Sequence, residues 1–191
     1  MSDEELQEYI KSIIKKYDYY DRVKDRLEIL RVGKVKNSKL LDIGAGYLSI
    51  LAAKKFNCKV TSIDVSQKKI EKLKEAAKKE RVKIRFLKAD GTKLPFADNS
   101  FDISVAYGTL HHCGKKYPQM VREMSRVSKK KVIVAEMTPC GVHLFDKYLH
   151  PEENHGKMAL DLENVRKLLE YYFKKIEIFH RKCFTTFVCI K

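Results

Sequence analysis

Several features that would assign this chain of 191 residues to other classes of protein are missing from its sequence. No apolar run approaches the length of a membrane span, so we expect no membrane association. The first ten residues, MSDEELQEYI, are acidic and amphipathic, unlike a secretory signal. The five cysteines form no CxxC pair and no spacing typical of small disulfide scaffolds, which favours free thiols in a reducing cytoplasm.

Negative charge is scarce, because 25 Asp and Glu stand against 40 Lys and Arg, which gives a formal net charge of +15. The excess is concentrated in residues 68–88 and 115–131. Clustered positive charge is typical of nucleic-acid binding, since it releases counterions from phosphates. Both runs also fit solvated helix faces, and abundant Lys and Glu without tryptophan resembles the surface of a heat-stable protein. A nucleic-acid partner is therefore one of two interpretations.

What the chain does contain is an alternation of strand and helix patterns. Apolar runs and alternating patterns predict strands, and apolar positions at helical spacing predict helices. The predicted strands are residues 39–44, 59–64, 82–90, 101–107, 131–137, 174–182 and 183–191. The predicted helices are residues 48–56, 67–80, 117–127 and 162–173, preceded by two helices within residues 3–32 that break near residues 17–20 and end at Gly33.

This alternation predicts the fold. Strands separated by helices need crossover connections, hence a mostly parallel sheet with helices on both faces. The last two strands are close enough to form a hairpin, which would add an antiparallel strand. We expect an α/β fold in one domain, residues 1–191: a single Rossmann-like, doubly wound, mostly parallel seven-stranded sheet with a C-terminal antiparallel hairpin and N-terminal helices.

The most informative stretch is KLLDIGAGYLSI, in which Gly44 and Gly46 directly follow the first strand. Glycine there lets the backbone turn tightly and approach a ligand. Asp42 precedes the turn and can orient it or accept from an ammonium group. Asp64 and Asp90 end the second and third strands, where carboxylates can accept from ribose hydroxyls and an adenine amino group. Ligands of such folds bind beyond these strand ends, so the pattern predicts a nucleoside-cofactor site. Taken singly, Asp64 also fits a helix N-cap and Asp90 a turn residue.

The order D-x-G-x-G, an acid ending the second strand, and then A-D-G-x-x-L-P-F-x-D-N-S-F-D resembles the class I S-adenosylmethionine-dependent methyltransferases. The similarity covers residues 36–137 and is closest to the small-molecule branch that includes ubiquinone and menaquinone methyltransferases. It implies S-adenosylmethionine as the cofactor. It implies these cofactor-binding residues: Asp42, Gly44 and Gly46 at the methionine end, Asp64 at the ribose, Val65, Asp90 and Gly91 at the adenine, Tyr107 near the sulfonium, and Tyr20, in the YYDR stretch, closing over the cofactor.

The resemblance also suggests a division of the chain. Residues 1–35 would form an N-terminal helical cap, residues 36–137 the cofactor-binding core, residues 138–160 a substrate lid, and residues 161–191 a closing helix and hairpin. One departure is Leu48, which stands where the family often has a third glycine that eases helix packing. The dinucleotide pattern G-x-G-x-x-G also fails, because its last position is Ser49.

Candidates for the chemistry lie in the segment GTLHHCG after the fourth strand. Methyl transfer from a sulfonium is an in-line displacement in which the enzyme aligns the two reactants and can remove a proton. His111 and His112 could supply a base near neutral pH, and the alternative for either is a packing or capping role. The displacement requires no metal. The absence of N-P-P-Y and D-P-P-Y after the fourth strand argues against the methylation of adenine or protein amides.

The segment HLFDKYLHPEENH, within residues 140–158, has two interpretations. His143, Asp146 and His150 follow each other at i, i+3 and i+7, so one helical face could present metal ligands, with His155 just beyond. The interpretation we favour is a substrate lid, in which His143, His150 and Phe145 contact the acceptor. We therefore assign no metal.

Four functions follow, in order of preference. The first is an S-adenosylmethionine-dependent methyltransferase for a small-molecule substrate. The second is an RNA methyltransferase, with tRNA as an example, that uses the basic surface. The third is a non-catalytic cofactor-binding partner subunit. A nicotinamide-dependent oxidoreductase is a distant fourth, which Ser49 disfavours.

Overall fold

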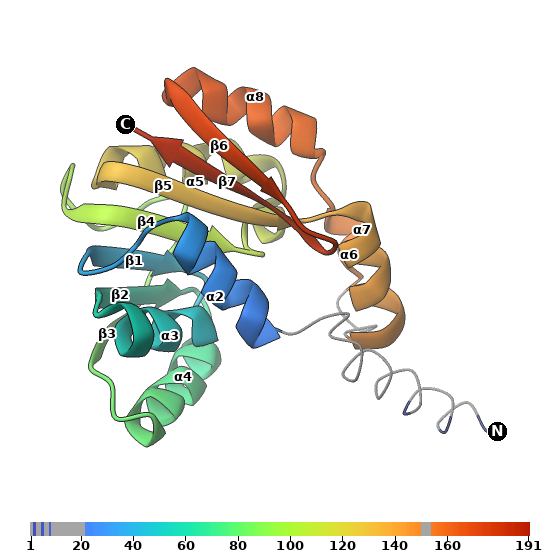
Figure 1. Cartoon of the computed structure of the whole chain (residues 1–191), viewed down its shortest axis with the longest axis horizontal. Helices are drawn as coiled ribbons and strands as arrows, with labels where there is room; N and C mark the ends of the chain where they lie inside the picture. Colours follow the sequence, from blue (N-terminus) through green and yellow to red (C-terminus); the bar gives the residue numbers. More distant parts are fainter. Residues whose placement is uncertain (1, 3–4, 6–7, 9–21, 150–153) are drawn as a thin grey trace.

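The computed structural model describes residues 22–149 and 154–191, together with residues 2, 5 and 8. Seven strands form one sheet in the order β3-β2-β1-β4-β5-β7-β6 (Figure 1). The strands are β1 (Lys39–Ile43), β2 (Lys59–Asp64), β3 (Ile84–Lys88), β4 (Phe101–Tyr107), β5 (Ser128–Met137), β6 (Lys175–His180) and β7 (Phe184–Ile190). Strands β1 to β5 pair in parallel, and β7 is antiparallel to both β5 and β6. The predicted fold class and the closing hairpin are confirmed.

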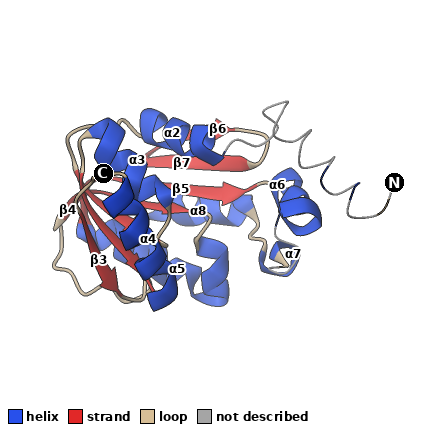
Figure 2. Cartoon of the chain, turned by 90° about the horizontal axis from the view of Figure 1, so that it is seen from below, coloured by secondary structure: helices blue, strands red, loops and turns tan. Residues whose placement is uncertain are grey.

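Helices cover both faces of this sheet (Figure 2). They are α2 (Arg22–Val32), α3 (Tyr47–Phe56), α4 (Gln67–Lys79), α5 (Tyr117–Val127), α6 (Pro139–Leu144), α7 (His155–Met158) and α8 (Leu162–Tyr172), with the 3₁₀ turns of η1 (Leu110–Lys116) and the π-helical turn η2 (Phe145–Leu149). Local sequence explains where they begin. The Ser66 hydroxyl accepts from the Lys69 amide at the start of α4, and the Asp161 carboxylate accepts from two amides at the start of α8.

Two apolar cores lie against the two faces of the sheet. One packs α2 and α3 against the sheet, with Leu30 and Leu51 among its buried residues. The other packs α5 and α8 against the opposite face, with Met124 and Leu169 among its buried residues. In β1 and β2 every residue after the first is buried, as expected for parallel strands that are covered on both sides. Among the described residues, no helix is long and apolar enough to cross a membrane.

The boundaries differ from the predicted ones at a few places. Strand β5 begins at Ser128, three residues earlier than predicted, because Ser128 pairs with Phe101 of β4, and its hydroxyl also donates to the Ser104 hydroxyl (2.8 Å). Strand β3 is shorter than predicted. The second N-terminal helix is α2, and Gly33 follows it where a Cβ would lie 2.3 Å from the side chain of Ile133. The predicted first helix falls mostly outside the described residues.

Candidate active site

A cavity of about 870 Å³ opens at the carboxyl ends of β1, β2 and β4. This volume lies within the range of small-molecule and cofactor sites. The predicted site residues among the described part of the chain all line it: Asp42, Gly44, Gly46, Asp64, Val65, Asp90, Gly91, Tyr107, His111 and His112. Tyr20 lies outside the described residues. The strand ends thus bring together residues that are up to 70 positions apart in the sequence.

The two glycines of the turn are needed for different reasons. Gly44 has φ = +90°, and a Cβ there would lie 2.4 Å from Oγ1 of Thr109. Its backbone conformation and its packing therefore both exclude a side chain. Gly46 has an extended backbone, and a Cβ there would meet nothing closer than the Gly44 carbonyl at 3.6 Å. Packing within the protein therefore does not require glycine at position 46, and we attribute the glycine to the space that a ligand in the cavity needs.

Asp64 fixes the turn through its carboxylate. Its Oδ2 accepts from the Ala45 amide (3.0 Å), and its Oδ1 accepts from the Ser66 amide (2.7 Å). The alternative that Asp64 is a helix N-cap is wrong, because the side chain of Ser66 caps α4. Next to it, Val65 is 63% exposed at the cavity rim, which is unusual for a large apolar side chain next to a buried strand.

Asp42 is the most perturbed acid of the site. Burial raises its pKa to about 7, although a hydrogen bond from Ser49 and the charge of Arg26 oppose the shift. The Ser49 hydroxyl donates to Oδ2 of Asp42 at 2.6 Å. Ser49, which breaks the dinucleotide pattern, therefore has a role here that glycine could not fill. Arg26 and Tyr107 extend this end of the cavity: the guanidinium lies 5.1 Å from the Tyr107 ring centroid, and that ring stacks on Phe184 at 4.7 Å.

Asp90 and Gly91 line another part of the cavity. Oδ1 of Asp90 accepts from the amide and the hydroxyl of Thr92, both at 2.8 Å, and these hydrogen bonds lower the pKa of Asp90. Asp90 is thus a turn residue, as the alternative interpretation has it, and it also lines the cavity. At Gly91 a Cβ would lie 2.9 Å from the Ile43 side chain.

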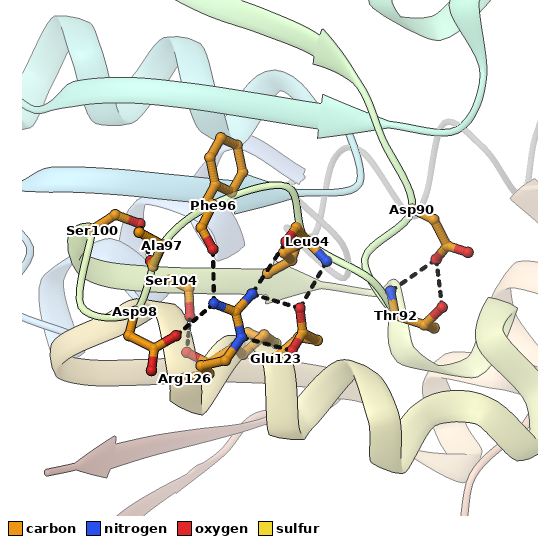
Figure 3. A network of polar contacts seen from close by, with 11 residues as sticks. Asp90, Thr92, Leu94, Phe96, Ala97, Asp98, Ser100, Ser104, Glu123 and Arg126 are labelled. Carbon is orange, nitrogen blue, oxygen red and sulfur yellow. Dashed lines mark hydrogen bonds and ion pairs between the residues drawn. The ribbon is translucent and has the colours of Figure 1, made fainter.

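Arg126 of α5 holds the loop that follows Asp90 (Figure 3). Its guanidinium donates to the carbonyls of Leu94 and Phe96 (3.1 and 2.7 Å) and to the carboxylates of Asp98 and Glu123. The Glu123 carboxylate also accepts from the Leu94 amide at 2.8 Å. The loop therefore has a defined path from the end of β3 to the start of β4.

His111 is paired with a carboxylate that the sequence analysis missed. Its Nδ1 lies 2.7 Å from Oε2 of Glu136, and the other oxygen of Glu136 accepts from the amides of Thr109 and Leu110 (3.0 and 2.7 Å). His111 and Glu136 are 3% and 2% exposed. The Nε2 atom of His111 is buried at the cavity wall and has no hydrogen-bond partner within the part of the chain that the structure describes.

Glu136 could have been found from its position. It lies near the end of β5, at the same edge of the sheet as Asp64 and Asp90, and an acid in the otherwise apolar run VIVAEM is costly to bury unless it is paired. The ring of His112 lies 4.2 Å from that of His111 and is exposed. The two histidines therefore differ in environment, because His111 is buried and His112 is exposed.

Two described residues of the segment 138–160 belong to the wall of the cavity. Phe145 and His155 line it, whereas His143 lines a separate cavity of about 490 Å³. His150 lies outside the described residues. Asp146 accepts from His155 and the Gly156 amide, and no group of three His, Cys, Asp or Glu among the described residues could hold a metal ion.

Comparisons with known proteins agree with this geometry. A family model described as a methyltransferase domain matches residues 41–135, from β1 to β5. The chain belongs to the class I S-adenosylmethionine-dependent methyltransferases. The methyl donor of this family is S-adenosylmethionine, and the cavity fits that molecule, because the room at Gly46, the exposed Val65 and the unpartnered Nε2 of His111 all face it.

Two relatives of this chain illustrate the similarity. It is 35% identical over 113 residues to the 27-O-demethylrifamycin SV methyltransferase of Amycolatopsis mediterranei (56% of this chain, 40% of the relative). It is 30% identical over 141 residues to the demethylmenaquinone methyltransferase of Thermotoga maritima (66% of this chain, 59% of the relative). The chain thus spans about half the length of these relatives. Among solved structures, an S-adenosylmethionine-dependent methyltransferase from Aquifex aeolicus shares the fold, with a TM-score of 0.66 and 23% identity over 94% of this chain and 97% of that one.

Proposed function

We propose that this chain transfers a methyl group from S-adenosylmethionine to a small-molecule acceptor, and that His111 is the base. The observation that carries the proposal is the Glu136–His111 pair, whose free Nε2 faces the cofactor-sized cavity. The two relatives are named for acceptors of the rifamycin and menaquinone type, which supports a small-molecule acceptor. Segment 138–160 would form the acceptor side of the cavity, and residues 36–137 the cofactor side.

The cofactor would lie along the strand ends. Asp42, Gly44 and Gly46 would hold its methionine end, and Asp64 its ribose, while Val65, Asp90 and Gly91 would contact the adenine. Tyr107 would lie near the sulfonium. Arg26, which the sequence analysis did not single out, lies over Tyr107 at the Asp42 end, where a guanidinium suits the cofactor carboxylate. Tyr20 remains a prediction from the sequence.

The chemistry asked of the protein is proton removal and alignment. When bound, S-adenosylmethionine supplies an electrophilic methyl group on a sulfonium that departs as a neutral thioether. The Glu136 carboxylate accepts from Nδ1–H of His111, which leaves the lone pair on Nε2 directed to the cavity. His111 would take the proton of the acceptor as the acceptor atom bonds to the methyl carbon. The resulting imidazolium is stabilised by Glu136, which keeps its two backbone hydrogen bonds.

A second candidate function is RNA methylation, since Lys69, Lys115 and Lys116 line the cavity. RNA binding that weakens steeply with salt would favour it. A buried base that faces the cavity argues against the third candidate, a non-catalytic subunit.

The five cysteines are free in the structure, which supports the predicted cytoplasmic location.

The deciding experiment is a calorimetric titration of the purified chain with S-adenosylhomocysteine, with NAD as the control. We expect binding of S-adenosylhomocysteine with a micromolar dissociation constant and no binding of NAD. Methyl transfer is then followed with S-adenosylmethionine labelled in the methyl group, first on pools of small metabolites and then on tRNA. Binding of NAD alone would contradict the proposal, and labelled tRNA without any labelled metabolite would replace it by the second candidate.

A further inference from the structure

Three lysines lie where the cavity opens to solvent, and we call them the rim lysines. Lys69 belongs to the first turn of α4, and Lys115 and Lys116 end η1. All three line the cavity and are exposed. Within residues 22–149 and 154–191, none of their side chains forms an ion pair, whereas Lys54 and Lys130 are paired with carboxylates. Their charge is therefore available to a ligand.

The cavity carries an excess of positive charge. Four basic side chains line it, those of Arg26 and the rim lysines, against the carboxyl groups of Asp42, Asp64 and Asp90. Asp42 has a pKa of about 7 and is therefore about half protonated at pH 7. S-adenosylmethionine adds a further positive charge, since its carboxylate balances its ammonium group but not its sulfonium. An acceptor thus enters a positive field, which attracts anions.

The rim lysines come from two separate elements at neighbouring strand ends. Lys69 follows the end of β2 by five residues, and β3, which pairs with β2, leads to Asp90. Hydrogen bonds from Thr92 lower the pKa of Asp90, and so does the charge of Lys116, which places this lysine near the same strand end. The solvated face of a single helix would not bring lysines from α4 and η1 to one edge of the sheet.

The turns of η1 connect the proposed base to two of the rim lysines. His111 is the second residue of η1, Lys115 and Lys116 are its last two, and all three line the cavity. A 3₁₀ helix rises about 2.0 Å per residue, so the path from His111 to Lys116 spans on the order of 10 Å, with a kink at Gly114. A small molecule can therefore reach from Nε2 of His111 to the ammonium group of a rim lysine.

We propose that the rim lysines bind an acidic group of a small methyl acceptor, a carboxylate or a phosphate, while His111 acts on the nucleophilic atom deeper in the cavity. The inference rests on the proposed function and adds the chemical class of the acceptor: an anion whose acidic group lies about one η1 length from the methylated atom. Lysine suits this role, because its ammonium group is a point charge on a mobile arm and binds either kind of anion.

The test compares an anionic probe with a neutral probe of the same shape. The full chain, saturated with S-adenosylhomocysteine, is titrated with para-hydroxyphenylpropionate and with the corresponding amide, and binding is followed by NMR. The rim variant combines Lys69→Gln, Lys115→Gln and Lys116→Gln. The control variant combines Lys74→Gln, Lys78→Gln and Lys79→Gln, which remove the same charge from exposed positions of α4 that do not line the cavity. Calorimetry with S-adenosylhomocysteine shows that each variant is folded and retains the cofactor site.

We expect the carboxylate probe to bind the unmodified chain and the control variant about tenfold more tightly than the amide, as a partly screened charged hydrogen bond would give. In the rim variant this preference should fall to about twofold or less, while the affinity for the amide stays unchanged. The preference of the unmodified chain should also decrease with added salt, because exposed charges are screened. Lysines that serve solubility alone would give no preference between the probes.

Three results would overturn the inference: equal affinity of the two probes for the unmodified chain, a preference that persists in the rim variant, or no binding of either probe at about 10 mM, on the order of the weakest specific small-ligand affinities. A uridine oligonucleotide of about 12 nucleotides represents the competing occupant. If its affinity falls equally in both variants and the small probes bind equally, the lysines belong to a polyanion surface and the inference is wrong.

These results are distinct from a failure of the proposed function. That failure would show before any probe is added, as no binding of S-adenosylhomocysteine to the unmodified chain.

Discussion

Nδ1 of His111 lies 2.7 Å from a carboxylate oxygen of Glu136, and the same carboxylate binds the backbone amides of Thr109 and Leu110. The carboxylate thus fixes both the imidazole and the turn that carries it. Because Glu136 comes from β5 and His111 follows β4, the pairing of these two parallel strands sets the position of the base. The relationship leads to a prediction on each partner.

His111→Ala should leave the affinity for S-adenosylhomocysteine unchanged and reduce kcat by about 10²- to 10⁴-fold, the usual contribution of a general base. His112→Ala is the matched control, because it removes the neighbouring, exposed imidazole. Rates are measured with labelled S-adenosylmethionine and the acceptor identified from the metabolite pools. Equal losses in the two variants would contradict the assignment of the base to His111.

Glu136→Gln should lower kcat, as His111→Ala does, although glutamine keeps a side-chain oxygen that can accept from the backbone amides. The side-chain NH₂ group of glutamine would donate to Nδ1 of His111, so the hydrogen of the imidazole would move to Nε2. Nε2 would then lack the lone pair that a base needs. ¹⁵N NMR of the histidine side chains reports this change of tautomer. An unchanged Nδ1-protonated signal in the variant would count against the pairing.

The two glycines of the turn should respond differently to alanine. Gly44→Ala should lower the free energy of unfolding by about 1–3 kcal/mol or more, because it adds left-handed backbone strain to a clash with Thr109. Gly46→Ala should be at least as stable as the unmodified chain and lose affinity for S-adenosylhomocysteine, because its methyl group enters the cavity. Thermal unfolding and calorimetry separate the two effects. A strongly destabilised Gly46→Ala would show that position 46 serves the fold.

Binding of the cofactor should depend on pH through Asp42, whose pKa is about 7. If the ionised carboxylate holds the cofactor ammonium, affinity should rise as pH increases through 7, and binding near pH 7 should release a proton. Calorimetry at pH 6, 7 and 8, about one unit on either side of that pKa, in buffers of different ionisation enthalpy measures both. Arg26 and Asp64 also act on this carboxylate, so Asp42→Asn is the control that should abolish the dependence.

The same shift has a consequence for stability. An aspartate in the unfolded chain titrates near pH 3.9. Between about pH 4 and the folded-state pKa of about 7, the folded chain holds a proton that the unfolded chain has lost. The free energy of unfolding contributed by Asp42 therefore falls as pH rises through this window and is constant above it. Denaturation of Asp42→Asn without cofactor should lack this decline.

Asp64→Ala should weaken the binding of S-adenosylhomocysteine by about 2 kcal/mol, or roughly 30-fold, because charged hydrogen bonds to the ribose are lost. The variant also loses its bonds to the Ala45 and Ser66 amides, so its thermal unfolding is measured alongside. Asp98→Ala is a suitable control, since Asp98 is an acid bound to Arg126 that does not line the cavity. Unchanged affinity in Asp64→Ala would refute the ribose assignment.

Much of the fold could be predicted because local patterns determine it. Strands 59–64 and 101–107 have the predicted bounds, since each is rich in β-branched or aromatic residues. Strand β5 was predicted too short because Lys129 and Lys130 look like a loop, and only the pairing of Ser128 across the sheet shows otherwise. A contact between distant residues has no signal in the local sequence.

The candidate site also has features that the local sequence predicts and features that depend on contacts between distant residues. The positions of Asp42, Gly44, Gly46 and Asp64 at the cavity follow from the strand–turn pattern, which places strand ends at one edge. The pairs Glu136–His111 and Asp146–His155 depend on how separate elements pack, so the sequence did not indicate which residues pair, although the acid in the apolar run VIVAEM is a signal for Glu136 itself. The spacing of His143, Asp146 and His150 likewise did not indicate that Asp146 is hydrogen-bonded to His155.

The empty space at Gly46 also bears on how such a sequence changes under selection. An alanine there meets no obstacle in the protein, and replacing glycine at a permissive site stabilises a chain by about 0.4–1 kcal/mol through the entropy of the unfolded state. Selection for heat resistance alone would therefore favour alanine at this position, and only selection for ligand binding would retain glycine. Position 46 is thus a place where thermal tolerance and activity are in direct conflict.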